Sequence, residues 1–280
     1  MELLPIYALP FTWAFLIFIL FAFIGWCSEE IYVGVLIEHR LINRGFLHGP
    51  LCPVYGFGGV VILMLPPNLY NTWVPLFLAS MVLCTVVEYF VSWLMEKLFH
   101  ARWWDYSHYK IQLNGRVCLL NSVLFGFLGL GVIRFIYPHI IEMLNWMGNF
   151  VIQVTAECIA VVLLVDLFFT VRKLVDFART MEKMKVFAES LKDHYGHEEW
   201  FRGESIAEMM TSVKEHIAEG KDKASQNILE KITRMQEMRH SAAEGFIKRF
   251  PTMQSVMYKE ELAHLKFCML KLKIKNKIKK

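Results

Sequence analysis

The sequence predicts an all-α membrane protein, a polytopic helix bundle of about five spans with the second short and broken, followed by a cytoplasmic helical domain. Three observations predict this fold class. The 280 residues are 55% hydrophobic and only 20% charged, which is more apolar than soluble domains usually are. Long apolar runs fill the chain up to residue 171 and give way to helical periodicity after it. The net charge changes sign at the same point.

Five apolar stretches form the membrane half, at residues 11–36, 51–65, 73–95, 117–137 and 148–171. Four of them reach the roughly 20 residues that a helix needs to cross the hydrocarbon core. The stretch 51–65 is shorter, and one proline and three glycines, at positions 53, 56, 58 and 59, interrupt it. We therefore expect it to be a broken or partly re-entrant helix.

The charges of the connecting loops predict the orientation, because cytoplasmic loops carry an excess of Lys and Arg. The loop after the first span carries Arg40 and Arg44, and the loop after the third carries Arg102, Lys110 and Arg116. The connections 66–72 and 138–147 hold one charged residue between them, a glutamate. We expect five crossings, with the N-terminus outside and the C-terminus in the cytoplasm.

We expect two domains, a transmembrane domain over residues 1–171 and a cytoplasmic α-helical domain over 172–280. The first carries 7 Lys+Arg against 10 Asp+Glu, and the second 23 against 16. The chain ends in KLKIKNKIKK, a basic tail of a kind attracted to anionic lipid headgroups or nucleic acid; such tails are more often solvated ends, and no nucleic-acid partner is expected.

An apolar stripe begins the second domain. Apolar residues alternate at spacings of three and four from Leu174 to Leu191, which predicts that span five continues as one long helix. Its stripe would pack on a second helix between Ile228 and Phe246. We favour such an intramolecular hairpin over a dimerising coiled coil, because the stripe covers too few heptads for a coiled coil.

Polar residues gather toward the cytoplasmic side of the membrane half. Glu29, in GWCSEEIY, shares a helical face with Tyr32. The segment NRGFLHGPLCPVYGFGG, residues 43–59, is too rich in Gly and Pro for one helix, and irregular backbone at membrane depth must be buried in protein or line a wet cavity. Cys84, Glu88 and Ser92, followed by a second glutamate at 96, recur every four residues on one face of span three.

We predict that these groups line a polar cavity open to the cytoplasm, in which Glu29 and Glu88 bind a cation or proton or hold the cavity's charge network. Asp105, with Arg102 and Arg116, would extend their charge network, whereas the rings of Trp103, Trp104 and Tyr106 suit an interfacial belt. Glu157 and Asp166 point in opposite directions on span five and are not assigned to the cavity. The predicted cavity residues are Glu29, Tyr32, Asn43, Arg44, Gly49, Pro50, Tyr55, Glu88, Glu96, Asp105, Asn114 and Arg116.

Several long motifs carry a family resemblance: GWxxExxY (25–32), NRGFLxGPxCPxYGxG (43–58), VEY with a second Glu at 96, RWWDYS (102–107) and LNGRVCL (113–119). Together they resemble the bacterial membrane family named Putative ABC-transporter type IV, or CmpB-type. FPTMQSVMYKEELAHLK (250–266) also looks like that family's C-terminal signature. The resemblance implies a transport function in the bacterial cell membrane, without assigning a role to any residue.

The function that we predict is that of a multi-pass transporter or permease component for a small solute or ion. Two alternatives stay open, a membrane enzyme that uses the same carboxylates on a lipid or isoprenoid at the inner interface, and a noncatalytic scaffold. No GxxxxGK[ST] run is present, so any ATPase must be a separate chain. We expect no cofactor and no metal site; the partners considered are the lipid bilayer, an ATPase subunit and a second copy of the chain.

Overall fold

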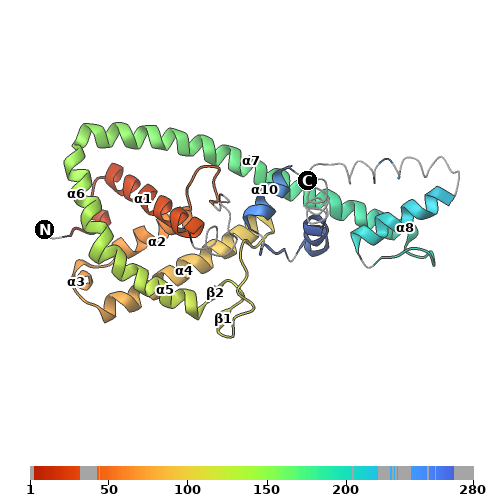
Figure 1. Ribbon diagram of the computed structural model, residues 1–280, viewed down its shortest axis with the longest axis horizontal. Coiled ribbons are helices and arrows are strands. Elements are labelled where there is room, and N and C mark those ends of the chain that lie inside the picture. Colours follow the sequence, from red (N-terminus) through yellow and green to blue (C-terminus); the bar gives the residue numbers. More distant parts are fainter. Residues whose placement is uncertain are drawn as a thin grey trace. The chain divides into compact units, whose positions relative to one another are not determined.

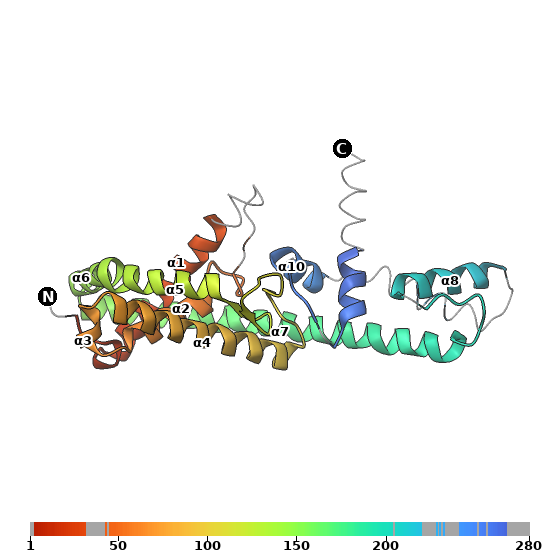
Figure 2. The same cartoon turned by 90° about the horizontal axis from the view of Figure 1, so that it is seen from below.

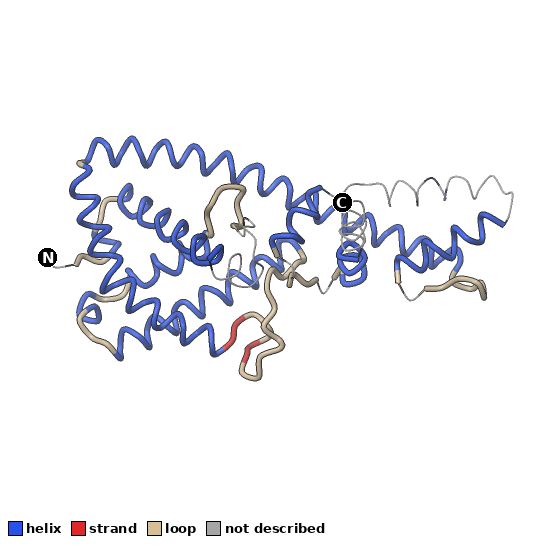
Figure 3. Tube along the Cα trace, in the orientation of Figure 1, coloured by secondary structure: helices blue, strands red, loops and turns tan. Residues whose placement is uncertain are grey.

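The computed structural model describes residues 3–31, 43, 45–203, 205–219, 228, 230, 232, 241–250, 252–255 and 257–267. The chain divides into two compact units. The first comprises Met1–Met95 and Arg102–Arg172, and the second comprises Glu96–Ala101 and Lys173–Lys280. Nearly all of the described secondary structure is helical (Figure 3).

Four of the described helices are long and apolar enough to cross a membrane. They are α1 (Phe11–Glu29), α4 (Val74–Phe99), the continuous helix Leu119–Met147 and α7 (Asn149–Tyr195). Shorter helices accompany them, namely η1 (Ile6–Ala8), α2 (Pro53–Leu63) and α3 (Pro67–Tyr70). The predicted membrane helix bundle is confirmed.

The second apolar stretch is short and broken, as expected. Helix α2 has 11 residues and rises only about 16 Å, roughly half of the hydrocarbon thickness. The backbone N–H of Cys52 donates to the carbonyl of Ala22 at 2.9 Å, so the chain before α2 lies beside the second half of α1. A methyl group on Gly25 would lie 2.3 Å from Cβ of Tyr55, and this close approach brings α1 and α2 together.

The segment 138–147, which we expected to be an outer connection, is helical instead. Helix α5 (Leu119–Gly131) passes through the π-helical turn η3 (Val132–Ile136) into α6 (Tyr137–Met147). In a regular α-helix the ring of Pro138 would clash with the carbonyl four residues earlier, whereas the wider π turn accommodates it. The chain then reverses at Gly148, whose φ of 74° favours glycine, and enters α7 directly.

The helices of the first unit alternate in direction. The Tyr137 hydroxyl donates to the carbonyl of Leu4, and the Arg134 guanidinium donates to the carbonyl of Thr72 at 3.3 Å. These bonds place the N-terminus, the connection before α4 and the start of α6 at one end of the unit. The end of α1 and the short hairpin β1–β2 lie toward the opposite end in both views (Figures 1 and 2).

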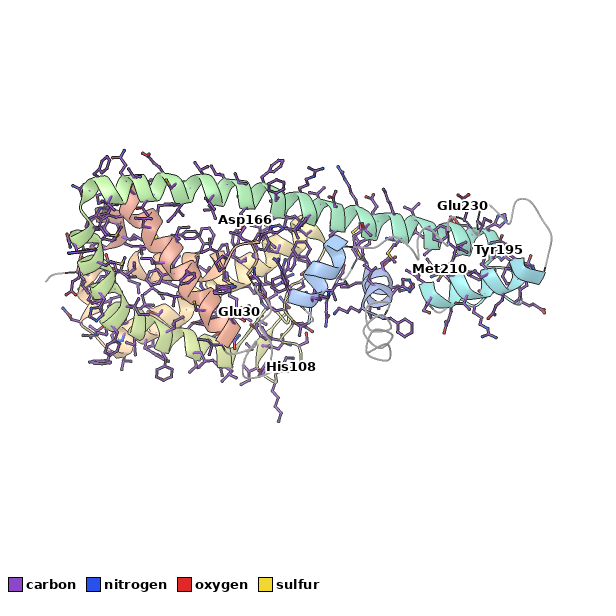
Figure 4. All side chains as sticks on the ribbon, turned by 45° about the horizontal axis from the view of Figure 1, so that its top comes forward. Glu30, His108, Asp166, Tyr195, Met210 and Glu230 are labelled. Atoms are coloured by element: carbon purple, nitrogen blue, oxygen red, sulfur yellow. The ribbon has the colours of Figure 1, made fainter. Side chains whose placement is uncertain are left out.

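In the second unit the apolar stripe of α7 is buried, as predicted. Leu191 packs with Met209 and Met210 of α8 (Ile206–Glu219) and with Ile232. Figure 4 labels Met210 of α8 near Tyr195 at the end of α7. The unit also contains α10 (Ser241–Arg249) and a helical segment at residues 259–267.

The ring of Phe177, on the same stripe, lies 6.1 Å from the ring of Phe246 in α10. The stripe therefore packs within the chain, and the expected contact with the region of Phe246 is present. The prediction lacked α8, which covers the last turns of α7.

Candidate functional site

Helix α4 carries a row of buried polar side chains along one face. The residues Ser80, Cys84, Glu88 and Ser92 are all buried, and their spacing of four keeps them on one side of the helix. Three of their polar atoms, Oγ of Ser80, Oε2 of Glu88 and Oγ of Ser92, have no hydrogen-bond partner among the described residues. The row extends over 12 residues, or about 18 Å. Such groups are rare in native proteins unless water, an ion or a solute completes them.

Glu88 lies at the centre of this row and is 7% exposed. Its Oε1 atom accepts a hydrogen bond from the Tyr106 hydroxyl at 3.2 Å, and the Asn121 amide donates to the same hydroxyl at 2.7 Å. Burial, followed by the neighbouring Glu88 carboxylate, raises the pKa of Tyr106 well above its ordinary value. Tyr106 is therefore a neutral hydrogen-bond donor that orients the Glu88 carboxylate.

A second carboxylate lies nearby, at the end of α1. The Tyr55 hydroxyl donates to Oε1 of Glu29 at 2.7 Å, which repeats the tyrosine–carboxylate pairing of Glu88. Glu29 interacts electrostatically with both Glu88 and Tyr106. The two tyrosine–carboxylate pairs thus form one acidic centre, contributed by α1, α2, α4 and the loop that carries Tyr106.

The loop between α4 and α5 forms a hairpin and brings Tyr106 to this centre. Strands β1 (Gln112–Leu113) and β2 (Val117–Cys118) pair antiparallel, and the turn between them has positive φ at Asn114 and Gly115. The Asn114 side chain donates to the Tyr89 hydroxyl at 3.0 Å, and the Arg116 guanidinium lies over the Tyr89 ring. The backbone N–H of Tyr106 donates to the carbonyl of Gly115 at 2.9 Å, so the hairpin fixes the position of Tyr106.

The irregular segment before α2 is held by a carboxylate of α7. The backbone N–H groups of His48 and Gly49 donate to the two oxygens of Asp166 at 2.8 and 2.7 Å. The His48 ring and the Thr170 hydroxyl also lie within 3.1 Å of Oδ1 of Asp166. Asn43 accepts a bond from the Trp26 indole at 2.9 Å and donates to the carbonyl of His48. These bonds satisfy polar backbone that would otherwise be costly at membrane depth.

A comparison with known protein families finds a match to the membrane half of the chain. The model of the family described as Putative ABC-transporter type IV matches residues 16–171. The chain belongs to this family. No curated protein and no solved structure matches the chain. The family match contains every predicted cavity residue and ends before the 250–266 motif, which it does not test.

Within this ABC-transporter type IV chain, the predicted cavity residues separate into several groups. Glu29, Tyr55 and Glu88 come together in the acidic centre. Asp105, Asn114 and Arg116 belong to the hairpin loop, and Asn43 and Gly49 belong to the segment that Asp166 holds. Pro50 is exposed, and Glu96 belongs to the second unit. Tyr32 and Arg44 lie outside the described residues.

The expected charge network takes a different form. Asp105 accepts bonds from the backbone N–H and the hydroxyl of Ser107 and lies 3.9 Å from the Arg102 guanidinium. These contacts brace the hairpin loop. Glu88 and Glu29 are paired by tyrosine hydroxyls, which are neutral donors that fit within an apolar interior at a smaller desolvation cost than a cation.

Sequence reasoning missed Tyr106, Asn121, His48, Asp166 and Thr170. Tyr106 and its neighbours were assigned to an interfacial belt, but Trp103 is buried and the Trp104 indole donates to the carbonyl of Arg116 at 3.0 Å. Asp166 and Asn121 were visible as polar residues in or beside apolar spans, which is itself a signal of function or pairing. The described residues contain no group of three or more His, Cys, Asp or Glu placed to hold a metal ion.

Proposed function

We propose that this member of the ABC-transporter type IV family is a membrane-spanning transport component that passes a small solute or ion along the polar face of α4. The main support for this proposal is the row of Ser80, Glu88 and Ser92. A buried polar atom of each has no hydrogen-bond partner among the described residues. In an apolar helix such groups are expensive and usually face a pathway or a bundle interior. The row is long enough to extend over more than half of the hydrocarbon core.

The acidic centre would select what passes. Glu29 and Glu88 place two groups that become negatively charged when they lose a proton in an environment of low dielectric constant, where electrostatic interactions act more strongly than in water. Anions are repelled there, whereas protons, cations and hydrogen-bonding neutral solutes are accepted. The segment 43–52 and the hairpin loop would cover the cytoplasmic side of this centre.

Complementation tests the proposal. A strain that lacks the protein would be complemented with the wild-type chain, with Glu88→Gln or with Glu29→Gln, and its intracellular ions and metabolites compared. We expect both variants to reach the membrane in normal amounts. We expect neither of them to restore the intracellular ion and metabolite levels that the wild-type chain restores. Glu142→Gln is the control, because Glu142 is exposed and interacts only with His139 among the contacts described for it. Full complementation by Glu88→Gln would remove this carboxylate from the transport path.

We propose further that the N-terminus is outside and the C-terminus cytoplasmic. The contact of Cys52 with α1, together with the packing of α2 against α1, supports a fifth crossing beside the four long helices, and the basic residues of the hairpin loop support its cytoplasmic side. Reporter fusions after Asn68 and after Lys110 test this: alkaline phosphatase should be active only at the first position and green fluorescent protein should fluoresce only at the second. The reverse pattern would invert the orientation.

A separate ATPase subunit is the partner that we propose from family membership. Purification of the tagged full-length chain in mild detergent should recover a nucleotide-binding subunit, identified by mass spectrometry. A homogeneous dimer of the chain, with no second subunit, would instead favour the homodimer.

A further inference from the structure

The chemistry of the acidic centre indicates which ion it binds. Glu88 is more than nine-tenths buried, one of its oxygens accepts a hydrogen bond from Tyr106 and the other has no partner among the described residues. An ionised carboxylate in such a position lacks both water and a compensating cation. Either a metal ion or a proton must neutralise it.

Among the described residues, the groups that act on Glu88 include no basic side chain. Glu29 acts on it from α1, Tyr106 from the hairpin loop, Asn121 from α5 and Cys84 from its own helix. Arg116, the basic residue of the neighbouring hairpin, lies over the Tyr89 ring. The charged group that acts on Glu88 among these is another carboxylate, Glu29, whose negative charge disfavours a second one beside it.

A metal ion fits this site poorly. Calcium takes six to eight oxygen ligands and magnesium requires an octahedral set, and the described residues contain no group of three or more metal-binding side chains. The hydroxyls of Tyr55 and Tyr106 are already oriented as donors toward Glu29 and Glu88. One carboxylate oxygen is enough to hold a proton.

We propose that Glu88 is a proton-binding residue, that it holds one proton on its Oε2 atom and that Tyr106 positions the carboxyl group; this inference rests on the transport function proposed above. The step is the transfer of one proton from a hydronium ion to the carboxylate: an O–H bond of the hydronium breaks, an O–H bond forms on Oε2, the negative charge of the carboxylate is neutralised and a water molecule remains. The reverse step returns the proton to water as hydronium. The proton is thus the transported or coupling ion of the pathway.

Infrared difference spectroscopy on the purified full-length protein tests the assignment directly. We expect a C=O stretching band of a protonated carboxylic acid, shifted in heavy water and lost as the pH rises. Glu88→Gln should remove the band and the control Glu142→Gln should leave it. Tyr106→Phe keeps the carboxyl group but removes its hydrogen-bond donor, so the band should persist at a shifted frequency, which a purely structural role of Tyr106 would not produce.

Several results would overturn the proposal. A wild-type spectrum without a band that depends on Glu88 would do so, as would removal of the band by Na⁺ or K⁺ at constant pH, since the site would then bind a metal cation. Proton binding and transport can also fail separately. A band that is lost in Glu88→Gln while this variant still complements contradicts the transport function, and loss of transport without any such band contradicts proton binding alone.

Discussion

Helix α7 exposes apolar side chains in its first half and buries them in its second. Between residues 149 and 171, large side chains such as Val162, Leu164 and Phe168 are exposed. Between residues 172 and 195, the stripe residues Leu174, Phe177, Met181, Met184, Ala188 and Leu191 are buried, and charged residues take most of the exposed positions. The same helical geometry therefore serves two solvents. In the membrane unit, the unusual feature is a polar side chain buried among the helices. In the second unit, the unusual feature would be a large apolar patch exposed to water.

The largest expected effect comes from placing a charge in the buried stripe. Met181 is 2% exposed, and Met181→Asp would leave an uncompensated charge in the interior of the second unit, at a cost of about 3–5 kcal/mol. We expect the full-length variant to be cleaved rapidly within residues 172–280 in limited proteolysis. A digestion pattern like that of the wild type would mean that the stripe is not a core.

A matched pair of valines tests the change of solvent along α7. Val162 is 68% exposed and Val186 is 60% exposed, yet we expect lipid around the first and water around the second. Val162→Lys should reduce the stability of the inserted protein by about 2.5–3.5 kcal/mol, and by less if the lysine side chain snorkels to the interface. Val186→Lys should change the stability by no more than about 0.5 kcal/mol. The measurement is the amount of folded protein in the membrane fraction. Equal yields for the two variants would contradict the comparison.

Replacing a closely packed glycine in the membrane unit should lower the stability by a smaller amount. Gly25→Ala would place a methyl group 2.3 Å from Cβ of Tyr55, and overpacking of this kind costs about 1–3 kcal/mol. Gly131→Ala is the control, because nothing lies within 4 Å of the added methyl group. Thermal unfolding in detergent should show a lower Tm for Gly25→Ala alone. An unchanged Tm would mean that α1 and α2 can move apart without any loss of stability.

The smallest expected effect is a local opening of segment 43–52 that leaves the rest of the fold intact. Asp166→Ala leaves the N–H groups of His48 and Gly49 without their acceptor, at about 1–3 kcal/mol, so segment 43–52 should open more often. In a chain that keeps Cys52 as its only cysteine, this buried thiol should react with a maleimide at least roughly fivefold faster. Asp176→Ala, which removes an exposed carboxylate from the same helix, should leave the rate unchanged. Equal rates in both variants would show that Asp166 does not restrain the segment.

These regions also differ in how much of them could be predicted. The inward row of Cys84, Glu88 and Ser92 followed from spacing alone, because every fourth residue of a helix shares a face. The broken second span followed from its proline and three glycines. Helix α6 was missed because Pro138 normally ends a helix, and the π turn that accommodates it has no clear sequence signal.

The partners of the acidic residues were harder to predict. Tyr106 reaches Glu88 only because the hairpin folds back, and Asp166 meets His48 across more than 100 residues of sequence. The Asn114–Gly115 pair was an available signal, since Asn-Gly between short strands is typical of a hairpin. Glu29, Tyr55 and Glu88 were predicted as members of one site, but their pairing with neutral hydroxyls depends on tertiary contacts.

The single residue between α6 and α7 limits how the membrane unit can move. Gly148 alone separates Met147 from Asn149, so the adjoining ends of these two helices remain within a few ångströms of each other. Any rearrangement that spreads them must be a rotation about this corner, and displacement grows with distance from it. The start of α5, beside the hairpin, and Asp166 of α7, which binds His48 and Gly49, lie far from this corner and would travel further than the residues that adjoin Gly148.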